Sequence, residues 1–511
     1  MLEESNNRKI AKNSLFLYLR MLVTLGIGLF TSRIVLQSLG IDNYGVYNVV
    51  GGVVVAFGFL NMSLTNSSSR FYSVTIAENN LKKLIETSNC IVTIHYGMAL
   101  FVLLLIETLG IWLLNHKLVI PSESMVAAHW VFQCSAITMF IGIISTPYNA
   151  MIISHEHMNM FAFISIFESF SKLAIAYLLF VLPDNLRLIF YSVLILIVQL
   201  FVRVLYTAYC KRKFAEANFK FKWNKAISIP ILKFAGWTMN GNVAVIGYTQ
   251  GINILLNIFF GPAVNAARGI AVQVQSAVKQ FFMSFQTAIN PQIMKSYATG
   301  NMDYMHELII RGSKFSYYLV WALVMPIMLN IDYLLSIWLI NPPQYSNSFI
   351  IIILCVCLVN TISTPLNYGI QATGDLKLFQ LVEGSILLSI VPLAWIGLKY
   401  LAFTPNDVFL TYLLIEIITQ ISRVLIVCKR ISINLSEYFN NLILKIFLVS
   451  IISFPLPLIL TKYLEESFWN LIISIIISEC CIILSIWTLG FNIEEKNFIK
   501  NKIGIILHKI I

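Results

Sequence analysis

The chain has 511 residues with a formal net charge of +11, and 58% of them are hydrophobic while only 12% are charged. A soluble domain usually carries about 25% charged residues, so this composition excludes an ordinary soluble protein. Apolar runs such as 91–114, 188–209 and 376–398 are long enough to cross a ~30 Å hydrocarbon core as helices, which excludes a barrel of short alternating strands. The sequence therefore predicts an all-α polytopic membrane protein.

Fourteen membrane-spanning helices are expected. They are placed near 13–36, 43–67, 89–114, 125–152, 158–182, 188–210, 231–259, 263–290, 311–339, 346–372, 376–400, 406–428, 441–462 and 466–490. Lys and Arg concentrate in the loops on one side of this map, as is typical of short cytoplasmic loops. The basic N-terminus is expected to be retained, because the apolar run after it is too long for a signal peptide. We predict a multi-pass protein of the inner (cytoplasmic) membrane with both termini in the cytoplasm.

A short motif occurs twice, and its position suggests an internal repeat. Ile144–Phe161 aligns without a gap with Ile362–Phe379, and both copies contain ISTPxN. The copies fall at the ends of the fourth and tenth spans, so the two halves share one orientation and the repeat is parallel. In transporters built from such repeats, substrate sites typically lie between the lobes near the midplane. The alternative is two unrelated helix ends that each contain a proline.

The repeat defines the expected domains. We place an N-terminal lobe of six spans at 1–210, a basic cytoplasmic linker at 211–230, a C-terminal lobe of six spans at 231–430, and two additional spans with a tail at 431–511. The prolines of the motif are expected to act as hinges in which the asparagines satisfy freed backbone groups. The hinge residues are Pro147, Asn149, Pro365 and Asn367.

The linker interleaves aromatic residues with lysines. Phe214, Phe219, Phe221 and Trp223 alternate with basic residues, a pattern that suits an anionic inner leaflet. An ordinary cytoplasmic loop with excess positive charge explains the composition equally well.

Polar side chains gather on one face of three predicted spans. Span 263–290 carries Arg268, Gln275, Lys279 and Gln286; span 231–259 carries Asn242, Thr249 and Asn253; and span 13–36 carries Arg20, Thr24 and Thr31. Because polar and charged groups inside a membrane are costly, the three helices are predicted to line one aqueous cavity. The alternative is that these groups satisfy one another between helices.

Further charges lie within the predicted spans. Arg33 is placed near an outer helix end, where snorkelling explains it as well as function does. Glu168 and Lys172 have the i, i+4 spacing of an ion pair and are structural first, with ion coupling as the second interpretation. The remaining intramembrane charges that we considered have no evident partner in the sequence, namely Glu107, Arg203, Glu383 and Glu416.

No motif points to catalysis or metal binding. GxxxxGK[ST], GxSxG and HExxH are all absent from the sequence, so no built-in ATPase or hydrolase is predicted. The eight cysteines lack companion histidines at zinc spacing, and His155 and His157 are expected to be solvated. We expect no enzyme activity, cofactor or metal and no nucleic-acid partner.

Several segments resemble one superfamily. The stretch LGIDNYGVYNVV at 39–50, the run FFGPAVNAARGIAVQVQSAVKQFF at 259–282, the two ISTPxN motifs and the plan of six, six and two spans resemble the multidrug/oligosaccharidyl-lipid/polysaccharide (MOP) exporters, and within them the bacterial polysaccharide flippases of the O-antigen type. The resemblance implies a V-shaped, MATE-like transporter. It would move undecaprenyl-pyrophosphate-linked oligosaccharides, for lipopolysaccharide O-antigen or another polysaccharide, between leaflets by alternating access.

The resemblance also suggests roles for particular residues. In that family basic residues of the central cavity handle the pyrophosphate, and the positions here that can do so are Arg20, Arg33, Arg268 and Lys279. Multidrug members usually have twelve spans, whereas peptidoglycan-precursor flippases have fourteen, the last two forming a lipid groove. Beyond the lipid-linked substrate and membrane lipids, the implied partners are a polysaccharide polymerase and a chain-length regulator.

Two other functions remain open. A cation-coupled multidrug antiporter would use Na⁺ or H⁺, and a membrane glycan polymerase or ligase is the enzymatic alternative. The spans at 13–36, 43–67, 231–259 and 263–290 contain no Asp or Glu, and three of them carry Arg or Lys, which favours an anionic substrate over a cationic drug. Glu168 is the residue that keeps the antiporter open, and the lack of a large outer loop counts against the enzyme.

Overall fold

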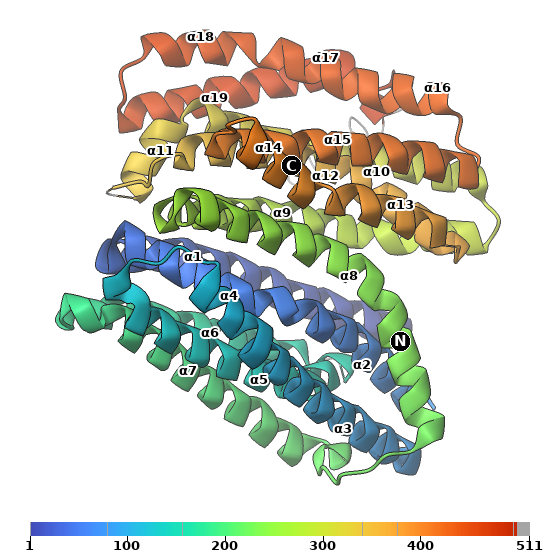
Figure 1. Ribbon diagram of the computed structural model, residues 1–511. Coiled ribbons are helices and arrows are strands. Elements are labelled where there is room, and N and C mark those ends of the chain that lie inside the picture. The colour runs from blue at the N-terminus through green and yellow to red at the C-terminus, as the bar shows by residue number, and fades with distance from the viewer. Residues whose placement is uncertain are drawn as a thin grey trace. The chain divides into compact units, whose positions relative to one another are not determined.

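The computed structural model describes residues 2–78, 80–155, 157–339, 341–375, 377–493 and 495–497. These residues form α-helices joined by short 3-10 and π-helical segments, with no strand among them (Figure 1). The predicted all-α polytopic class is therefore confirmed. The chain divides into two compact units: unit 1 comprises Met1–Ile270, Trp338–Ser346 and Gly384–Thr411, and unit 2 comprises Ala271–Ile337, Asn347–Glu383 and Tyr412–Ile511.

Unit 1 is built mainly from the first half of the chain. Its helices are α1 (Leu2–Val55), α2 (Phe59–Ala77), α3 (Leu81–Leu105), α4 (Ile111–His116), α5 (Met125–Ser154), α6 (Met158–Leu178), α7 (Asp184–Lys213), α8 (Lys225–Phe260), the start of α9 (Pro262–Ala298), and α14 (Ile390–Tyr400). Short segments at Ala56–Gly58, Ile106–Gly110, Ser122–Ser124, Leu179–Val181 and Ala215–Ala217 connect or extend them. α5 packs along α7, α1 along α6 and α2 along α8 (Figure 1).

Glycines let two helices of unit 1 approach α1 closely. A Cβ on Gly45 would lie 1.9 Å from the carbonyl oxygen of Pro262, and one on Gly52 would lie 2.2 Å from Nδ2 of Asn253. Small residues at helix contacts are the usual means of packing in a membrane, where burial of apolar surface between helices gains little. The sequence of α1 thereby fixes where α8 and α9 begin to pack against it.

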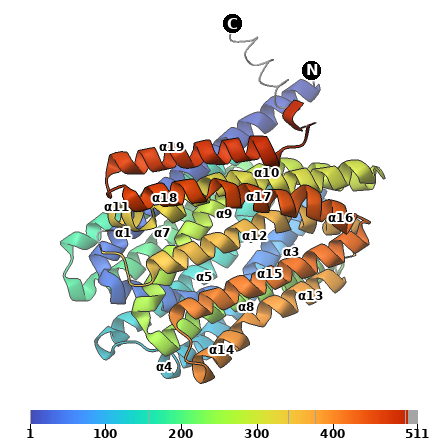
Figure 2. The same ribbon diagram turned by 90° about the horizontal axis from the view of Figure 1, so that it is seen from above.

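Unit 2 contains the remaining helices. They are the rest of α9, α10 (Met302–Leu329), α11 (Ile331–Trp338), α12 (Ser346–Thr373), α13 (Lys377–Leu388), α15 (Pro405–Arg430), α16 (Leu435–Tyr438), α17 (Leu444–Ser453), α18 (Pro455–Tyr463) and α19 (Phe468–Ser485), with π-helical turns at Phe439–Ile443 and Ile486–Gly490. Some of these helices reach into unit 1 at their ends. α19 lies beside α17, α18 and α10 (Figure 2).

A buried ion pair holds the end of the last span to unit 2. Glu495, which follows α19, accepts a hydrogen bond from Lys314 of α10 at 2.7 Å, and both side chains are at most 2% exposed. A Cβ on Gly490 would lie 2.7 Å from the hydroxyl of Tyr318. The two additional spans are thus packed directly against α10.

Twelve helices among the described residues are long and apolar enough to cross a membrane. The predicted count of fourteen is approximate for two reasons. The first and second predicted spans share α1, which continues through a bend at Gly40, where φ is 76°. The predicted span 263–290 forms part of α9, which is not among the twelve and carries Arg268, Lys279 and several glutamines.

Candidate functional site

The two cations of the α9 stripe have different surroundings. Arg268 is half-buried and donates from Nη2 to the carbonyl oxygen of Thr249 on α8 at 2.6 Å. Lys279 is exposed, and it forms no hydrogen bond or ion pair with the residues that the structure describes. Gln275 lies between them and is half-buried. One cation is therefore engaged by a backbone carbonyl, and the other is available to a ligand.

Gln286, the last member of the stripe, is a packing residue in unit 2. Only 1% of it is exposed. Its Nε2 donates to the hydroxyl of Ser316 at 3.1 Å and to the carbonyl oxygen of Thr361 at 3.0 Å. The alternative interpretation, contact between helices, describes its position.

The polar residues of α8 also lie in contacts between helices. Asn253 is 1% exposed; it donates to the carbonyl oxygen of Asn48 at 3.3 Å and accepts from Asn265 at 2.8 Å. The hydroxyl of Thr249 donates to the carbonyl oxygen of Val245 at 2.8 Å within its own helix. The side chain of Asn242 lies outside the described residues.

On α1 the predicted polar face includes Arg20, which has a hydrogen-bond donor without a partner among the described atoms. The guanidinium of Arg20 lies 4.8 Å from the ring centre of Phe161, and its buried Nε has no hydrogen-bond partner among the described atoms. Thr24 and Thr31 donate to carbonyl oxygens four residues earlier on α1, at 2.8 and 2.7 Å. Arg33 is half-buried. The threonines are thus satisfied locally, as is common for hydroxyls in membrane helices.

Both prolines of the repeated motif lie inside long helices rather than at their ends. Pro147 is in α5, which continues to Ser154, and Pro365 is in α12, which continues to Thr373. A proline has no N–H, so the carbonyl four residues earlier loses its helical donor. For Pro365 this is the carbonyl of Thr361, which accepts the hydrogen bond from Gln286.

A second carbonyl is bound in both copies of the motif. The carbonyl oxygen of Ile362 accepts from the hydroxyl of Ser313 at 3.3 Å, and that of the aligned Ile144 accepts from Nη1 of Arg203. The guanidinium of Arg203 also lies 4.6 Å from the ring centre of Tyr148. Side chains of other helices therefore hold equivalent backbone positions in the two copies.

The expectation that the motif's asparagines satisfy the freed backbone groups is wrong for this conformation. No hydrogen bond from the side-chain amide of Asn149 or Asn367 to a backbone carbonyl occurs among the described residues, and the Oδ1 atom of each is also buried without a partner. From a neighbouring helix, Gln286 instead reaches the carbonyl that Pro365 frees, and Arg203 binds the carbonyl of Ile144, next to the one that Pro147 frees. Each asparagine lies six residues after the carbonyl that its proline frees, about 9 Å along the helix, which is beyond the reach of its side chain.

The predicted pair on α6 is present. Nζ of Lys172 lies 2.6 Å from Oε1 of Glu168, and Gln199 of α7 donates to the same oxygen at 2.9 Å. Glu107, another charge without an evident partner, accepts from Nε2 of Gln133 at 3.1 Å. The carboxylate of Glu168 is therefore neutralised by a lysine within its own helix.

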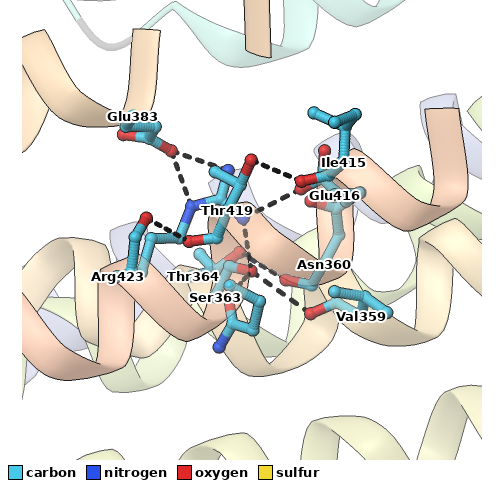
Figure 3. A network of polar contacts seen from close by, with 11 residues as sticks. Val359, Asn360, Ser363, Thr364, Glu383, Ile415, Glu416, Thr419 and Arg423 are labelled. Atoms are coloured by element: carbon cyan, nitrogen blue, oxygen red, sulfur yellow. Dashed lines mark hydrogen bonds and ion pairs between the residues drawn. The ribbon is translucent and has the colours of Figure 1, made fainter. Parts of the chain in front are cut away.

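In unit 2, Arg423 links Glu383 and Glu416, the two remaining carboxylates for which the sequence showed no partner (Figure 3). Its Nε donates to Glu383 of α13 at 2.7 Å, and its Nη1 donates to Glu416 of α15 at 2.8 Å and to the hydroxyl of Ser363 at 3.0 Å. Ser363 in turn donates to Gln420 at 2.5 Å. Arg423 is 5% and Glu416 2% exposed, so this network joins α12, α13 and α15 in the interior.

Arg423 is not among the intramembrane charges predicted from the sequence. Glu416 and Arg423 are seven residues apart on one helix, a spacing that places them on the same face, and this was the signal that could have paired them. The contribution of Glu383 has no such signal, because it comes from another helix. Ser363 lies within the second copy of the repeated motif.

The two histidines in the first copy of the repeated motif form hydrogen bonds to other side chains and are not simply solvated, which corrects our expectation. Nε2 of His155 lies 2.6 Å from Oε1 of Glu216, whose side chain is 3% exposed, and Nδ1 of His157 lies 2.7 Å from the hydroxyl of Tyr209. The ring of His155 stacks on Phe214 at 4.2 Å. Through Glu216 and Phe214, the segment after α7 is thereby attached to the first copy of the motif. No cluster that could hold a metal occurs among the described residues.

The helical arrangement is that of known membrane transporters. No protein-family model and no curated protein matches the chain. Among solved structures, the lipid II flippase MurJ in an inward closed conformation is similar with a TM-score of 0.68 and 15% identity, covering 92% of this chain and 97% of its own.

Two further structures have the same fold. An inward-facing multidrug resistance MATE transporter of the MOP superfamily has a TM-score of 0.61 and 13% identity, covering 81% of this chain and 94% of its own. A MOP superfamily transporter from Pyrococcus furiosus, described as having a binding pocket of reversed polarity that suggests a different function, has a TM-score of 0.59 and 12% identity, with 82% and 96% covered. The chain therefore has the fold that MurJ and MATE transporters share.

Proposed function

We propose that the protein is a flippase that moves an undecaprenyl-pyrophosphate-linked oligosaccharide across the cytoplasmic membrane by alternating access. The substrate would be a repeat unit of O-antigen or another surface polysaccharide. In this proposal both termini are cytoplasmic, and a polysaccharide polymerase consumes the product under the control of a chain-length regulator.

The pairing of the intramembrane acidic and basic side chains is the observation that carries this proposal. Glu168 is paired with Lys172, and Glu383 and Glu416 are paired with Arg423. By contrast, neither Arg20 nor Lys279 forms an ion pair with the part of the chain that the structure describes. Arg20 and Lys279, two of the basic residues proposed to contact the substrate, thus keep a positive charge without a carboxylate partner. A guanidinium or ammonium binds pyrophosphate through charge-assisted hydrogen bonds about twice as strong as neutral ones.

The extent of the structural match supports a lipid-linked substrate. MurJ, a lipid II flippase, covers 92% of this chain, whereas the two MOP superfamily transporters above cover 81% and 82%. The greater coverage favours MurJ over the two other transporters as the counterpart of the whole chain, including its two additional spans. A binding pocket of reversed polarity in the Pyrococcus furiosus transporter is a precedent for changed charge on this fold.

In this proposal the four basic residues Arg20, Arg33, Arg268 and Lys279 handle the pyrophosphate in turn as the substrate crosses. An inside-negative potential favours outward passage of the anion by about 2.3 kcal/mol per charge per 100 mV, so no ATPase is needed. The hinge role stays with Pro147 and Pro365. Coupling to Na⁺ or H⁺ through Glu168 would first require that its ion pair with Lys172 opens.

A charge-reversal series tests the proposal. In a strain lacking the gene, Lys279→Glu should abolish surface glycan and leave lipid-linked oligosaccharide in the inner leaflet, whereas Lys279→Arg should retain part of the activity. Lys399→Glu reverses an exposed lysine on α14, outside the proposed site, and should export at the parental rate. Parental export by Lys279→Glu present at normal levels would exclude this site.

The multidrug antiporter remains the second candidate, because several of the similar structures are MATE transporters. It predicts a different dependence on charge. A lipophilic cation such as ethidium should be extruded by the parental protein and at least as well by Lys279→Glu. Extrusion of ethidium with no defect in glycan export in the deletion strain would replace the flippase proposal with the antiporter.

A further inference from the structure

Unit 1 contains an apolar groove that the proposed transport path does not use. Its volume is about 590 Å³, within the range of roughly 300–1,000 Å³ typical of pockets that hold small ligands. The groove runs along the middle of α3 and is lined in part by the linker. Its lining includes Tyr96, Gly97, Phe101, Phe140, Phe221 and Trp223.

The linker crosses α3 with its two kinds of side chain on opposite sides. Phe219 stacks on Tyr96 at 5.7 Å, and Phe221 lies 5.3 Å from Phe219 on the same side. Lys222 points the other way and binds Glu86 at 2.9 Å. Glu86 and Tyr96 are about 15 Å apart along the helix, so the aromatic side chains face the middle of α3 and the lysine faces its end.

This arrangement is that of a segment at a membrane interface. Phe221 and Trp223 remain 72% and 52% exposed beside the groove although they are large and apolar. The backbone N–H of Lys220 donates to Asn89 at 2.8 Å, which fixes the linker's position on α3. Aromatic rings beside hydrocarbon with lysines toward water are typical of interfacial anchors.

The segments beside the groove carry several lysines. Lys82, Lys220, Lys222 and Lys225 are all exposed, and the carboxylate of Glu86 faces Lys82 and Lys222. The hydrogen bond to Glu86 raises the pKa of Lys222 above its ordinary value, so that lysine stays charged. Lys220 and Lys225 flank Phe221 and Trp223 in the sequence, so positive charge lies next to the linker residues that line the groove.

We propose that this groove is a binding site for an anionic phospholipid of the leaflet that the linker faces. One acyl chain lies along α3 between Gly97 and Phe140, and the headgroup phosphate lies against Lys220 and Lys225. Any lipid tail fits an apolar groove about equally well, since tails are as apolar as leucine, so selectivity has to come from the headgroup. Each lysine is worth about a fivefold preference for anionic over zwitterionic lipid.

Quenching of Trp223 by brominated lipids tests the site in the full-length protein reconstituted in nanodiscs. The fluorescence lost in Trp223→Phe isolates the signal of this one tryptophan. We expect brominated phosphatidylglycerol to quench that signal at a much lower mole fraction than brominated phosphatidylcholine. In Lys220→Gln/Lys225→Gln the preference should fall by about 25-fold.

Two variants at Gly97 test the apolar part of the groove. A Cβ on Gly97 meets no atom within 4 Å, so Gly97→Ala should bind as the parent does, while Gly97→Phe should fill the groove and remove the quenching. Lys399→Gln, outside the groove, should leave the preference unchanged. Both tests are independent of whether the protein is a flippase.

Two results would overturn the proposal. Equal quenching by the two brominated lipids would mean that the groove is an unselective lipid-facing surface. Relief of quenching by about one mole per cent of undecaprenyl pyrophosphate would mean that the occupant is a polyprenyl chain instead of a phospholipid.

Discussion

Arg423 compensates the charges of Glu383 and Glu416 in unit 2. Replacing it with leucine leaves Glu383 and Glu416 without their shared cation, and breaking a buried ion pair in this way costs about 3–5 kcal/mol. We therefore expect Arg423→Leu to lower the free energy of unfolding by that amount, measured by titration with SDS in mixed micelles.

The control for Arg423 is another arginine of the same helix. Arg430 pairs with Asp375, but both side chains are more than half exposed, so Arg430→Leu should cost less than about 1 kcal/mol. The triple variant Arg423→Leu/Glu383→Gln/Glu416→Gln removes all three charges and should recover much of the loss. A triple variant as unstable as Arg423→Leu alone would show that packing, not charge, sets the effect.

At the scale of the helix, Gln286 of α9 satisfies the backbone carbonyl that Pro365 frees in α12. Pro365→Ala restores an N–H that can bond to the carbonyl of Thr361 within the helix, so Gln286 is no longer needed there. Gln286→Ala should cost about 1 kcal/mol in the parental protein and clearly less in Pro365→Ala. A double-mutant cycle on the free energy of unfolding measures this coupling.

The control cycle uses the proline in the first copy of the motif. Pro147 and Gln286 share no hydrogen-bond partner, so Pro147→Ala and Gln286→Ala should be additive. Each proline variant should also impair transport while inserting normally in the membrane, because the hinge would stiffen. Unchanged transport in both proline variants would count against a hinge in either joint.

For the whole molecule, the distribution of Lys and Arg predicts the topology. Fusions of alkaline phosphatase and green fluorescent protein after Lys222 should report a cytoplasmic location, and fusions after Lys117 an outer one. Both residues lie in exposed connections between helices, where a fusion point is tolerated. The opposite signal at either position would invert the topology on which the proposed direction of transport depends.

The helices themselves were largely predictable from the sequence. In a lipid environment every backbone polar group has to be satisfied within the segment, so long apolar runs become helices whatever surrounds them. The kinked continuity of α1 at Gly40 and the polar α9 were the places where a count of runs gave two more spans than the twelve candidates of the structure. The ion pair of Glu168 with Lys172 was also local, because four residues of one helix set its geometry.

The partners of the other polar groups were decided only by the tertiary structure. Helical periodicity correctly placed Arg268, Lys279 and Gln286 on one helix, but it gives an angle around an axis and not the neighbour at that angle. Hence Gln286 proved to bind Thr361 while Lys279 remained exposed. The bridge from Arg423 to Glu383 and the contact of Arg203 with Ile144 join residues 40 and 59 positions apart, and such contacts form only when separate helices pack.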